Sequence, residues 1–225
     1  MDSNLTRLLF PNGVEFEAIE DFTLATPLTH LESTLITKAV PKRIADFRAG
    51  RHCARVALSR LGYSRFDLLS GDHREPLWPN GVVGSISHCS NMAAAVVALD
   101  EEFVSIGIDI EIAEPLTSSL MKRILLPEET AMMADWDANV PWGKLLFSAK
   151  EAFYKAWFPI FKTRLEFQEV SVTLSPLTGD FSTGEFSVQI RSDRSTAELS
   201  ALGRFVLHRG YWWTGYSVLT VGRTT

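Results

Sequence analysis

Three apolar runs between residues 82 and 111 constrain the fold of this chain more than any other feature. They cover Val82 to Ser87, Ala93 to Leu99 and Val104 to Glu111. Short runs of this kind, bounded by polar and turn-forming residues, are typical of β-strands. The sequence therefore predicts three strands in the middle of the chain.

Two longer segments predict helices. Residues 41–61 begin with Pro41 and repeat apolar residues at helical spacing. Residues 142–158, "WGKLLFSAKEAFYKAWF", predict a second helix that Pro159 closes. Between them, residues 117–136 predict one or two short helices broken at Pro127, and strands return from Val170. Helices and strands mix without strict alternation, which predicts an α+β fold.

An acidic cluster separates the second apolar run from the third, and it is the best place for a boundary. It consists of Asp100, Glu101 and Glu102. A chain of 225 residues is long enough for one large domain or two small ones. We therefore predict an N-terminal half, residues 1–102, and a C-terminal half, residues 103–225.

Charge and cysteine content exclude several classes of protein. The net charge of −5 argues against bulk binding to nucleic acid or to an anionic membrane. Cys53 and Cys89 are far apart, which excludes a disulfide framework and a cysteine-type zinc site. The longest apolar stretch, "MAAAVVAL", is too short to span a bilayer. These features predict a soluble, cytoplasmic protein with no membrane or nucleic-acid partner.

Two acids interrupt the third apolar run. Asp109 and Glu111 are two residues apart, so on a strand both side chains lie on the same face. Two close carboxylates repel each other and are costly to bury unless solvent, a basic partner or a cation such as Mg²⁺ compensates them. The simplest interpretation is that the strand leaves the core at Gly107 and the acids face water.

The second predicted helix, within "FSAKEAFYKAWFP", contains charged residues that could compensate the two acids. Glu151 and Lys155 are spaced i, i+4, and such a surface pair contributes roughly 0.3–0.5 kcal/mol. The surrounding aromatic residues instead favour partial burial. A third carboxylate beside Asp109 and Glu111 would complete an oxygen-rich Mg²⁺ site, with Lys155 next to it to meet phosphate.

Basic and polar residues in the first half offer phosphate contacts. Arg48, Arg51 and Arg55 form a stripe on the first predicted helix, and arginine donates two parallel hydrogen bonds to phosphate. A solvated helix face explains the same stripe equally well. Ser87 and His88 follow the first apolar run and could meet a phosphate oxygen.

Together these segments resemble the Sfp-type 4′-phosphopantetheinyl transferases, the group that includes enterobactin synthetase component D. The resemblance rests on "GIDIE" at 107–111 and "FSAKEAFYKAWFP" at 147–159, with "FRAGRHCARVAL" and "REPLWPNGVVGSISHC" before them in the same order. It covers about Lys42 to Glu169 and is closest to actinobacterial members. Either acidic motif alone would be weak, whereas the ordered set is highly specific.

The resemblance implies a fold and a reaction. The fold is two similar α/β halves in a pseudo-twofold arrangement, with the active site in the cleft between them. The enzyme transfers the 4′-phosphopantetheine arm of coenzyme A to a serine of an apo carrier protein, with Mg²⁺ as cofactor and 3′,5′-ADP as the second product. The expected partners are acyl or peptidyl carrier domains of fatty-acid, polyketide or nonribosomal peptide synthases, and the expected state is a monomer.

The resemblance also implies roles for individual residues. The Mg²⁺ ligands would be Asp109, Glu111 and Glu151. The catalytic residues would be Glu151 as general base, Lys155 on the leaving group, and Asp109. The residues that bind coenzyme A would be Arg43, Arg51, His73, Arg74, Ser87, His88, Lys150 and Lys155. Within this set, Arg43 and Arg51 would hold the 3′-phosphate, and Ser87 and His88 the pyrophosphate.

Two points stay open. Similar enzymes have a phosphate-binding lysine where this chain has Glu75, so the contact is expected to shift to His73 or Arg74. Residues 117–136 would form a flap for an acidic carrier helix through Leu120, Met121, Ile124 and Leu125, beside Lys122 and Arg123. The same apolar residues could equally pack against their own domain.

Two alternative functions also stay open. One is a Mg²⁺-dependent nuclease or phosphohydrolase, and the other is a carrier-binding module without activity.

Overall fold

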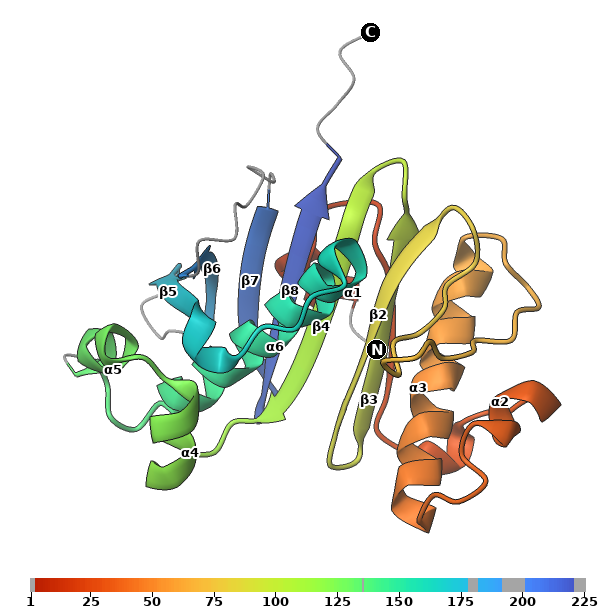
Figure 1. The fold of residues 1–225 in the computed structure, drawn as a ribbon, viewed down its shortest axis with the longest axis horizontal. Helices are drawn as coiled ribbons and strands as arrows, with labels where there is room; N and C mark the ends of the chain where they lie inside the picture. Colours follow the sequence, from red (N-terminus) through yellow and green to blue (C-terminus); the bar gives the residue numbers. More distant parts are fainter. Residues whose placement is uncertain (1–2, 135, 178–181, 192–200, 221–225) are drawn as a thin grey trace, which may run out of the picture.

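Two antiparallel sheets form the centre of the molecule (Figure 1). The computed structural model describes residues 3–134, 136–177, 182–191 and 201–220. The three-stranded sheet has the order β1-β3-β2, with β1 Glu15–Ile19, β2 Val82–Cys89 and β3 Met92–Leu99. The five-stranded sheet has the order β4-β8-β7-β6-β5, with β4 Phe103–Ile112, β5 Val170–Pro176, β6 Thr183–Ile190, β7 Ala201–His208 and β8 Tyr211–Leu219.

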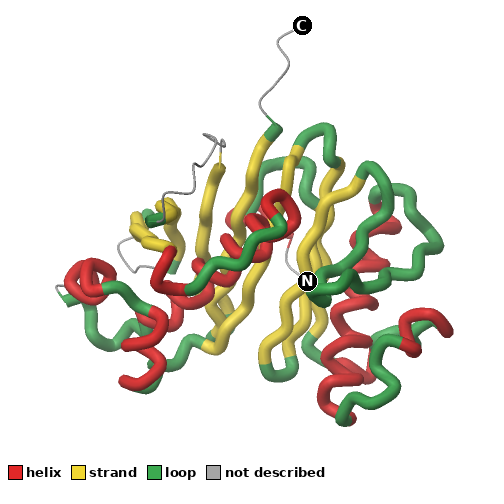
Figure 2. Tube along the Cα trace, viewed as in Figure 1, coloured by secondary structure: helices red, strands yellow, loops and turns green. Residues whose placement is uncertain are grey.

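Helices flank both sheets (Figure 2). The described helices are α1 Ser3–Leu9, α2 His30–Thr34, α3 Pro41–Arg60, α4 Ser118–Ile124, α5 Pro127–Met133 and α6 Trp142–Phe161, with short 3₁₀ turns at Phe22–Leu24 and Phe167–Glu169. This mixture of helices with two antiparallel sheets confirms the predicted α+β class. None of these helices has the length and hydropathy needed to cross a membrane.

The apolar strand β3 is buried on both faces, which explains why its sequence does not alternate. Ala93 and Ala95 pack toward α3, whereas Ala94, Val96 and Ala98 face the core that lies against β4. A strand covered on both sides needs apolar residues at every position. The small alanines also let α3 approach the sheet closely.

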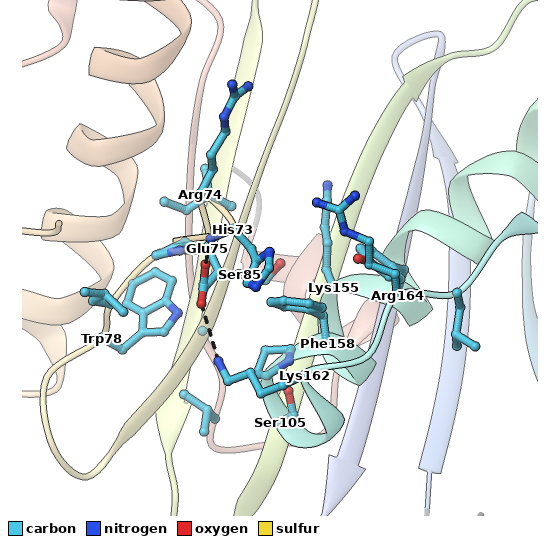
Figure 3. A pocket seen from close by; sticks show the side chains of 18 of the residues that line it. His73, Arg74, Glu75, Trp78, Ser85, Ser105, Lys155, Phe158, Lys162 and Arg164 are labelled. Carbon is cyan, nitrogen blue, oxygen red and sulfur yellow. Dashed lines mark hydrogen bonds and ion pairs between the residues drawn. The ribbon is translucent and has the colours of Figure 1, made fainter. Parts of the chain in front are cut away.

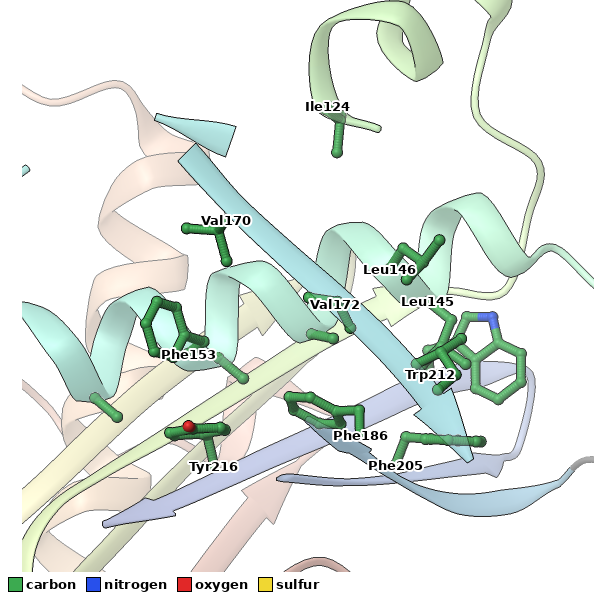
Figure 4. Packing of buried hydrophobic residues seen from close by; sticks show 14 of the residues in the cluster. Ile124, Leu145, Leu146, Phe153, Val170, Val172, Phe186, Phe205, Trp212 and Tyr216 are labelled. Carbon is green, nitrogen blue, oxygen red and sulfur yellow. The ribbon is translucent and has the colours of Figure 1, made fainter. Parts of the chain in front are cut away.

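Helix α6 packs on the five-stranded sheet and forms the largest core of the described residues (Figure 4). Phe153 of α6 meets the ring of Tyr216 edge-on, with 5.2 Å between ring centroids. Gly107 lets α6 lie this close to β4, because a Cβ atom at that position would be 1.9 Å from the carbonyl oxygen of Ala152. The prediction that β4 leaves the core at Gly107 is therefore wrong: Ile108 and Ile110 beyond it are fully buried.

The two sheets are joined by a shared core and by side-chain hydrogen bonds. The backbone N–H groups of Ile108 and Ile110 on β4 donate to the hydroxyls of Ser85 and Ser87 on β2, each at 3.2 Å. Helix α1 lies against β7 and β8, although it belongs to the first part of the sequence. The sheets divide the chain between Leu99 and Phe103, but the core is continuous across them. The separation into two domains stays a prediction.

Two predicted helix ends can be compared with the structure. The break at Pro127 is confirmed, since Pro127 is the first residue of α5. Helix α6 does not close at Pro159 but continues to Phe161 and is capped by Lys162, in a left-handed conformation. A proline in the last turn loses only one intrahelical hydrogen bond, so the helix continues past it.

Candidate active site

A cavity of about 710 Å³ opens between the two sheets (Figure 3). One wall is the loop 73–78 and strand β2, and the other is the second half of α6 with residues 164–166. Its lining combines aromatic and apolar side chains, such as Trp78 and Phe158, with the cations Lys155 and Lys162. A cavity of this size and mixed lining is suited to a small-molecule ligand.

Asp109 is the most densely bonded acid beside this cavity, and it is 4% exposed. One oxygen, Oδ1, accepts from Lys155 Nζ at 2.7 Å and from Ser87 Oγ at 3.0 Å. The other, Oδ2, accepts from Ser148 Oγ at 2.8 Å. Three donors stabilise the ionised carboxylate, which explains how the chain tolerates an acid in a buried strand.

Lys155 connects this buried acid to the cavity that it lines. Its ammonium also donates to the carbonyl of Ile108 at 3.0 Å and to Ser87 Oγ at 3.1 Å. The ion pair of Lys155 is with Asp109, not with Glu151 as the i, i+4 spacing predicted. A lysine so oriented presents positive charge to the cavity, next to the buried Asp109.

Glu111 and Glu151 are the other two predicted metal ligands. Burial raises the pKa of Glu111, and the negative charge of Asp109 raises it further. Burial likewise raises the pKa of Glu151; Lys155 opposes this shift, while Asp109 and Glu111 add to it. The three carboxylates therefore lie close enough to influence one another, as the sequence predicted for Asp109 and Glu111.

Their fit to Mg²⁺ rests on donor chemistry. All three are oxygen donors, which Mg²⁺ prefers, and a divalent ion would relieve their mutual repulsion. In the structure ammonium groups take that role: Lys155 contacts Asp109, and Lys144 Nζ donates to Glu111 Oε2 at 3.1 Å. Among the described residues, no three histidine, cysteine or acidic side chains are already arranged around a common metal position.

Replacing Glu151 with glutamine is expected to stabilise the metal-free protein at neutral pH. A raised pKa means that the folded state disfavours the ionised carboxylate, so this cost appears as the pH rises above the ordinary value of 4.5. We expect Glu151→Gln to raise the melting temperature at pH 7.5 by about 2–4 °C, the shift that roughly 1 kcal/mol gives in a chain of this size.

Thermal denaturation in chelating buffer measures this effect. At pH 4 the difference between Glu151→Gln and the parent should shrink toward zero, because Glu151 is then mostly protonated in both the folded and the unfolded state. An equal difference at both pH values would show that the ionisation of Glu151 is not its cause.

His88 and Arg43 lie together near the outer part of the site. Arg43 Nη1 donates to His88 Nε2 at 3.2 Å, which requires a neutral imidazole. Burial lowers the pKa of His88; Asp46 opposes this shift, while Arg43 and Lys155 add to it. The structure thus brings His88, Arg43 and Lys155 into one positively charged region.

Arg51 is a buried cation without an acidic partner among the described ion pairs. Its guanidinium lies over the ring of Phe47, at 3.6 Å, and donates to Ser70 Oγ at 3.0 Å, but its Nε is unpaired. Burial lowers the pKa of Arg51 to about 10. An anion would satisfy this cation. Of the rest of the predicted stripe, Arg55 pairs with Glu32, whereas Arg48 is half-buried, donates to the carbonyl of Phe22 and, like Arg51, has an unpaired Nε.

His73 and Arg74 both line the cavity. The ring of His73 meets Phe158 edge-on, with centroids 5.2 Å apart. Arg74 has a φ of +69°, a conformation that residues other than glycine rarely adopt. Its side chain extends away from the centre of the cavity (Figure 3).

Lys150, which the sequence analysis placed among the cofactor-binding residues, does not line the cavity. Lys150 is 2% exposed, and its ammonium donates to Glu129 Oε2 and to the carbonyl oxygens of Ile124 and Phe167, at 2.8, 2.8 and 3.0 Å. All three acceptors lie outside the cavity lining. Lys150 lies five residues before Lys155 and therefore points to another side of the helix.

Two residues of the site were missed by the sequence reasoning. Lys144 binds Glu111, and Ser148 binds Asp109. A signal was present, since Lys144, Ser148, Glu151 and Lys155 are spaced i, i+4, i+7 and i+11 and so share one helix face. This polar face lies within an otherwise apolar helix, and it is turned toward the acids of β4.

The predicted flap residues divide between two roles. Ile124 and Leu125 are buried in the core of the C-terminal half, so they pack against their own domain. Leu120 is exposed, and Met121 is half-buried against the same core. Only part of the predicted docking surface is therefore free.

Comparison with known proteins identifies the family. The model of the 4′-phosphopantetheinyl transferase N-terminal domain matches residues 31–98, and that of the 4′-phosphopantetheinyl transferase superfamily matches residues 105–207. The 4′-phosphopantetheinyl transferase PptT of Mycobacterium tuberculosis is 41% identical over 213 residues, which cover 92% of this chain and 93% of that protein. The chain belongs to the 4′-phosphopantetheinyl transferases. It is therefore an enzyme, and the resemblance seen in the motifs is confirmed.

Two further relatives support the same assignment. The enzyme Npt of Nocardia iowensis is 36% identical, with 90% of this chain and 95% of Npt aligned. Enterobactin synthase component D of Salmonella typhi is 37% identical, but only 52% of this chain and 49% of that protein align. The full-length similarity is thus to actinobacterial enzymes.

Proposed function

We propose that this transferase moves the 4′-phosphopantetheine arm of coenzyme A to a serine of an apo carrier protein and releases 3′,5′-ADP. The observation that carries this proposal is the Asp109–Lys155 pair, whose lysine lines a cavity between the two sheets. We also propose that the halves are related by a pseudo-twofold axis. Each half has a helix of 20 residues, α3 or α6, packed on an antiparallel sheet, which supports this relation.

Coenzyme A would bind along the positively charged region and the cavity. Arg51 and Arg43 would hold its 3′-phosphate, because Arg51 is a buried cation that lacks an acidic partner among the described ion pairs. Ser87, His88 and Lys155 would contact the pyrophosphate, with His73 or Arg74 adding a further contact. The neutral arm would lie in the cavity against Phe158.

Mg²⁺ would be held by Asp109, Glu111 and Glu151. When bound, it would neutralise the charge of the pyrophosphate and so make the phosphorus more electrophilic. The ion pairs of Asp109 with Lys155 and of Glu111 with Lys144 support this assignment, because two of the three carboxylates already bind cationic groups.

Glu151 would act as the general base, either directly or through a water molecule. Its raised pKa makes it a stronger base than an exposed glutamate. It would accept the proton of the carrier serine, whose oxygen forms a bond to the β-phosphorus as the bond to the bridging oxygen of 3′,5′-ADP breaks. Lys155 would stabilise the negative charge that develops on that leaving oxygen.

The partner would be a carrier domain of a fatty-acid, polyketide or nonribosomal peptide synthase. Exposed Leu120, with Lys122 and Arg123 on the same helix, suits the acidic helix of such a domain. The relative named enterobactin synthase component D supports a role in siderophore synthesis. We further propose a cytoplasmic monomer.

Intact-mass spectrometry tests the reaction. An apo carrier protein incubated with coenzyme A, Mg²⁺ and this enzyme should gain the mass of one phosphopantetheine, and Glu151→Ala should reduce the rate by about 10²–10⁴-fold. No gain on several carrier types, together with no binding of coenzyme A, would refute the proposed function.

A further inference from the structure

An ion pair connects the two walls of the cavity at the end away from Asp109. Lys162 Nζ, at the end of α6, lies 3.5 Å from Glu75 Oε1 in the loop before β2 (Figure 3). Both residues line the cavity. The Glu75 side chain is 18% exposed and that of Lys162 is 58% exposed, so the pair lies at the border between the cavity and solvent.

Glu75 is fixed by its own loop. Its Oε2 accepts from the backbone N–H of His73 at 3.0 Å, and its backbone carbonyl accepts from Gly71 at 2.8 Å. The carboxylate is therefore held in place before it meets Lys162. It can orient a flexible lysine side chain that would otherwise extend into solvent.

The backbone conformation at position 162 is unusual for a lysine. It caps α6 with φ +49°, a left-handed conformation that glycine adopts without steric cost. Its ammonium lies 5.4 Å from the centroid of the Phe158 ring, which also contacts His73. Retention of a lysine at a strained cap is consistent with a role for its side chain.

Lys155, Phe158 and Lys162 lie along one face of α6, since residues seven apart in a helix are nearly two full turns apart. The two ammonium groups thus arise from positions about 10 Å apart along the axis. Along this side of the cavity the Phe158 ring therefore lies between the two lysine side chains (Figure 3).

We propose that Lys162, oriented by Glu75, is a further substrate-binding residue, which contacts an amide carbonyl of the pantetheine arm. This inference rests on the proposed function. Lys155 holds the charged end of coenzyme A, Phe158 packs against the arm, and Lys162 donates to the arm near the mouth of the cavity. Glu75 is a positioning residue for the Lys162 ammonium.

Lys162→Gly tests the proposal without endangering the fold, because glycine suits the left-handed cap. The dissociation constants of coenzyme A and of 3′,5′-ADP, which lacks the arm, would be measured by calorimetry. We expect the coenzyme A value to rise about three- to tenfold, as for loss of a partly exposed charged hydrogen bond, and the 3′,5′-ADP value to stay unchanged. The melting temperature should stay equal or rise.

Arg209→Gly is a matched control. Arg209 also has a positive φ, +52°, and forms an exposed ion pair, with Glu20 at 3.0 Å, but it does not line the cavity. The Arg209→Gly variant should leave both dissociation constants unchanged.

A charge exchange tests the role of Glu75. The double variant Glu75→Lys with Lys162→Glu should restore part of the coenzyme A affinity that Lys162→Glu alone loses, since an ammonium returns to the mouth.

The outcomes separate this inference from the proposed function. Unchanged coenzyme A affinity in Lys162→Gly, or an equal loss for coenzyme A and 3′,5′-ADP, would overturn the role of Lys162 and leave the transferase intact. A parent protein that binds neither molecule would overturn the proposed function and this inference with it.

Discussion

Asp109→Asn is expected to reduce the rate of phosphopantetheine transfer by about 10²–10³-fold, the range seen when one preorganised electrostatic contact to a transition state is lost. Asparagine has the same shape but no charge. The Lys155 ammonium, now 2.7 Å from a carboxylate oxygen, would lose its ion pair, and the proposed metal site would lose one of its ligands. The initial rate of holo carrier formation, followed by intact mass, measures the effect.

A graded comparison makes this result interpretable. Ser148→Ala removes one of the hydrogen bonds to Asp109 but leaves its charge and its contact with Lys155. We expect a smaller loss, about tenfold, comparable with the loss of an outer-shell partner of a metal ligand. If Asp109→Asn retains more than a tenth of the parent rate while it is fully folded, Asp109 is not at the reacting centre.

The middle strands and the two long helices could be predicted because their patterns are local. The apolar runs from Val82 to Glu111 and the helical spacing after Pro41 and Trp142 each depend on a few neighbouring residues. The shared face of Asp109 and Glu111 follows from strand geometry alone. The burial of Asp109 did not follow, because two of its compensating donors, Lys155 and Ser148, come from another element.

The choice of ionic partners depended on tertiary structure. Lys155 pairs with Asp109, 46 residues away, because an almost fully buried carboxylate is costly without a cation. In the same way, Arg55 differs from Arg48 and Arg51 only because it finds an acidic partner, Glu32, on α2. A stripe of arginines in a sequence does not show which of them is free for a ligand.

The position of Lys150 was misjudged for a related reason. Lys150 and Lys155 belong to the same sequence motif of the family. A spacing of five residues nevertheless turns their side chains toward different neighbours. The partner that defines the role of Lys150 is Glu129, on α5, and no local pattern connects the two. The contact between α5 and α6 depends on the tertiary structure.

Lys150→Met is expected to lower the free energy of unfolding by about 3–5 kcal/mol, the usual effect of removing one member of a buried ion pair. Glu129 is 1% exposed and would remain as a buried charge without its cation. Its oxygens would keep only the backbone N–H donors of Leu126 and Val172, each at 2.8 Å. Urea denaturation measures the change.

Two further variants separate the buried pair from the surface and from the active site. Arg209→Met removes an exposed ion pair with Glu20, whose two side chains are 61% and 51% exposed, and should cost no more than roughly 0.5 kcal/mol. The double variant Lys150→Met with Glu129→Gln should recover much of the stability, because no unpaired charge remains buried.

Coenzyme A affinity, measured where Lys150→Met is still folded, should match that of the parent, since Lys150 lies outside the cavity. Unchanged stability together with lost coenzyme A binding would instead return Lys150 to the substrate-binding residues, and would mean that its three buried contacts open when the substrate binds.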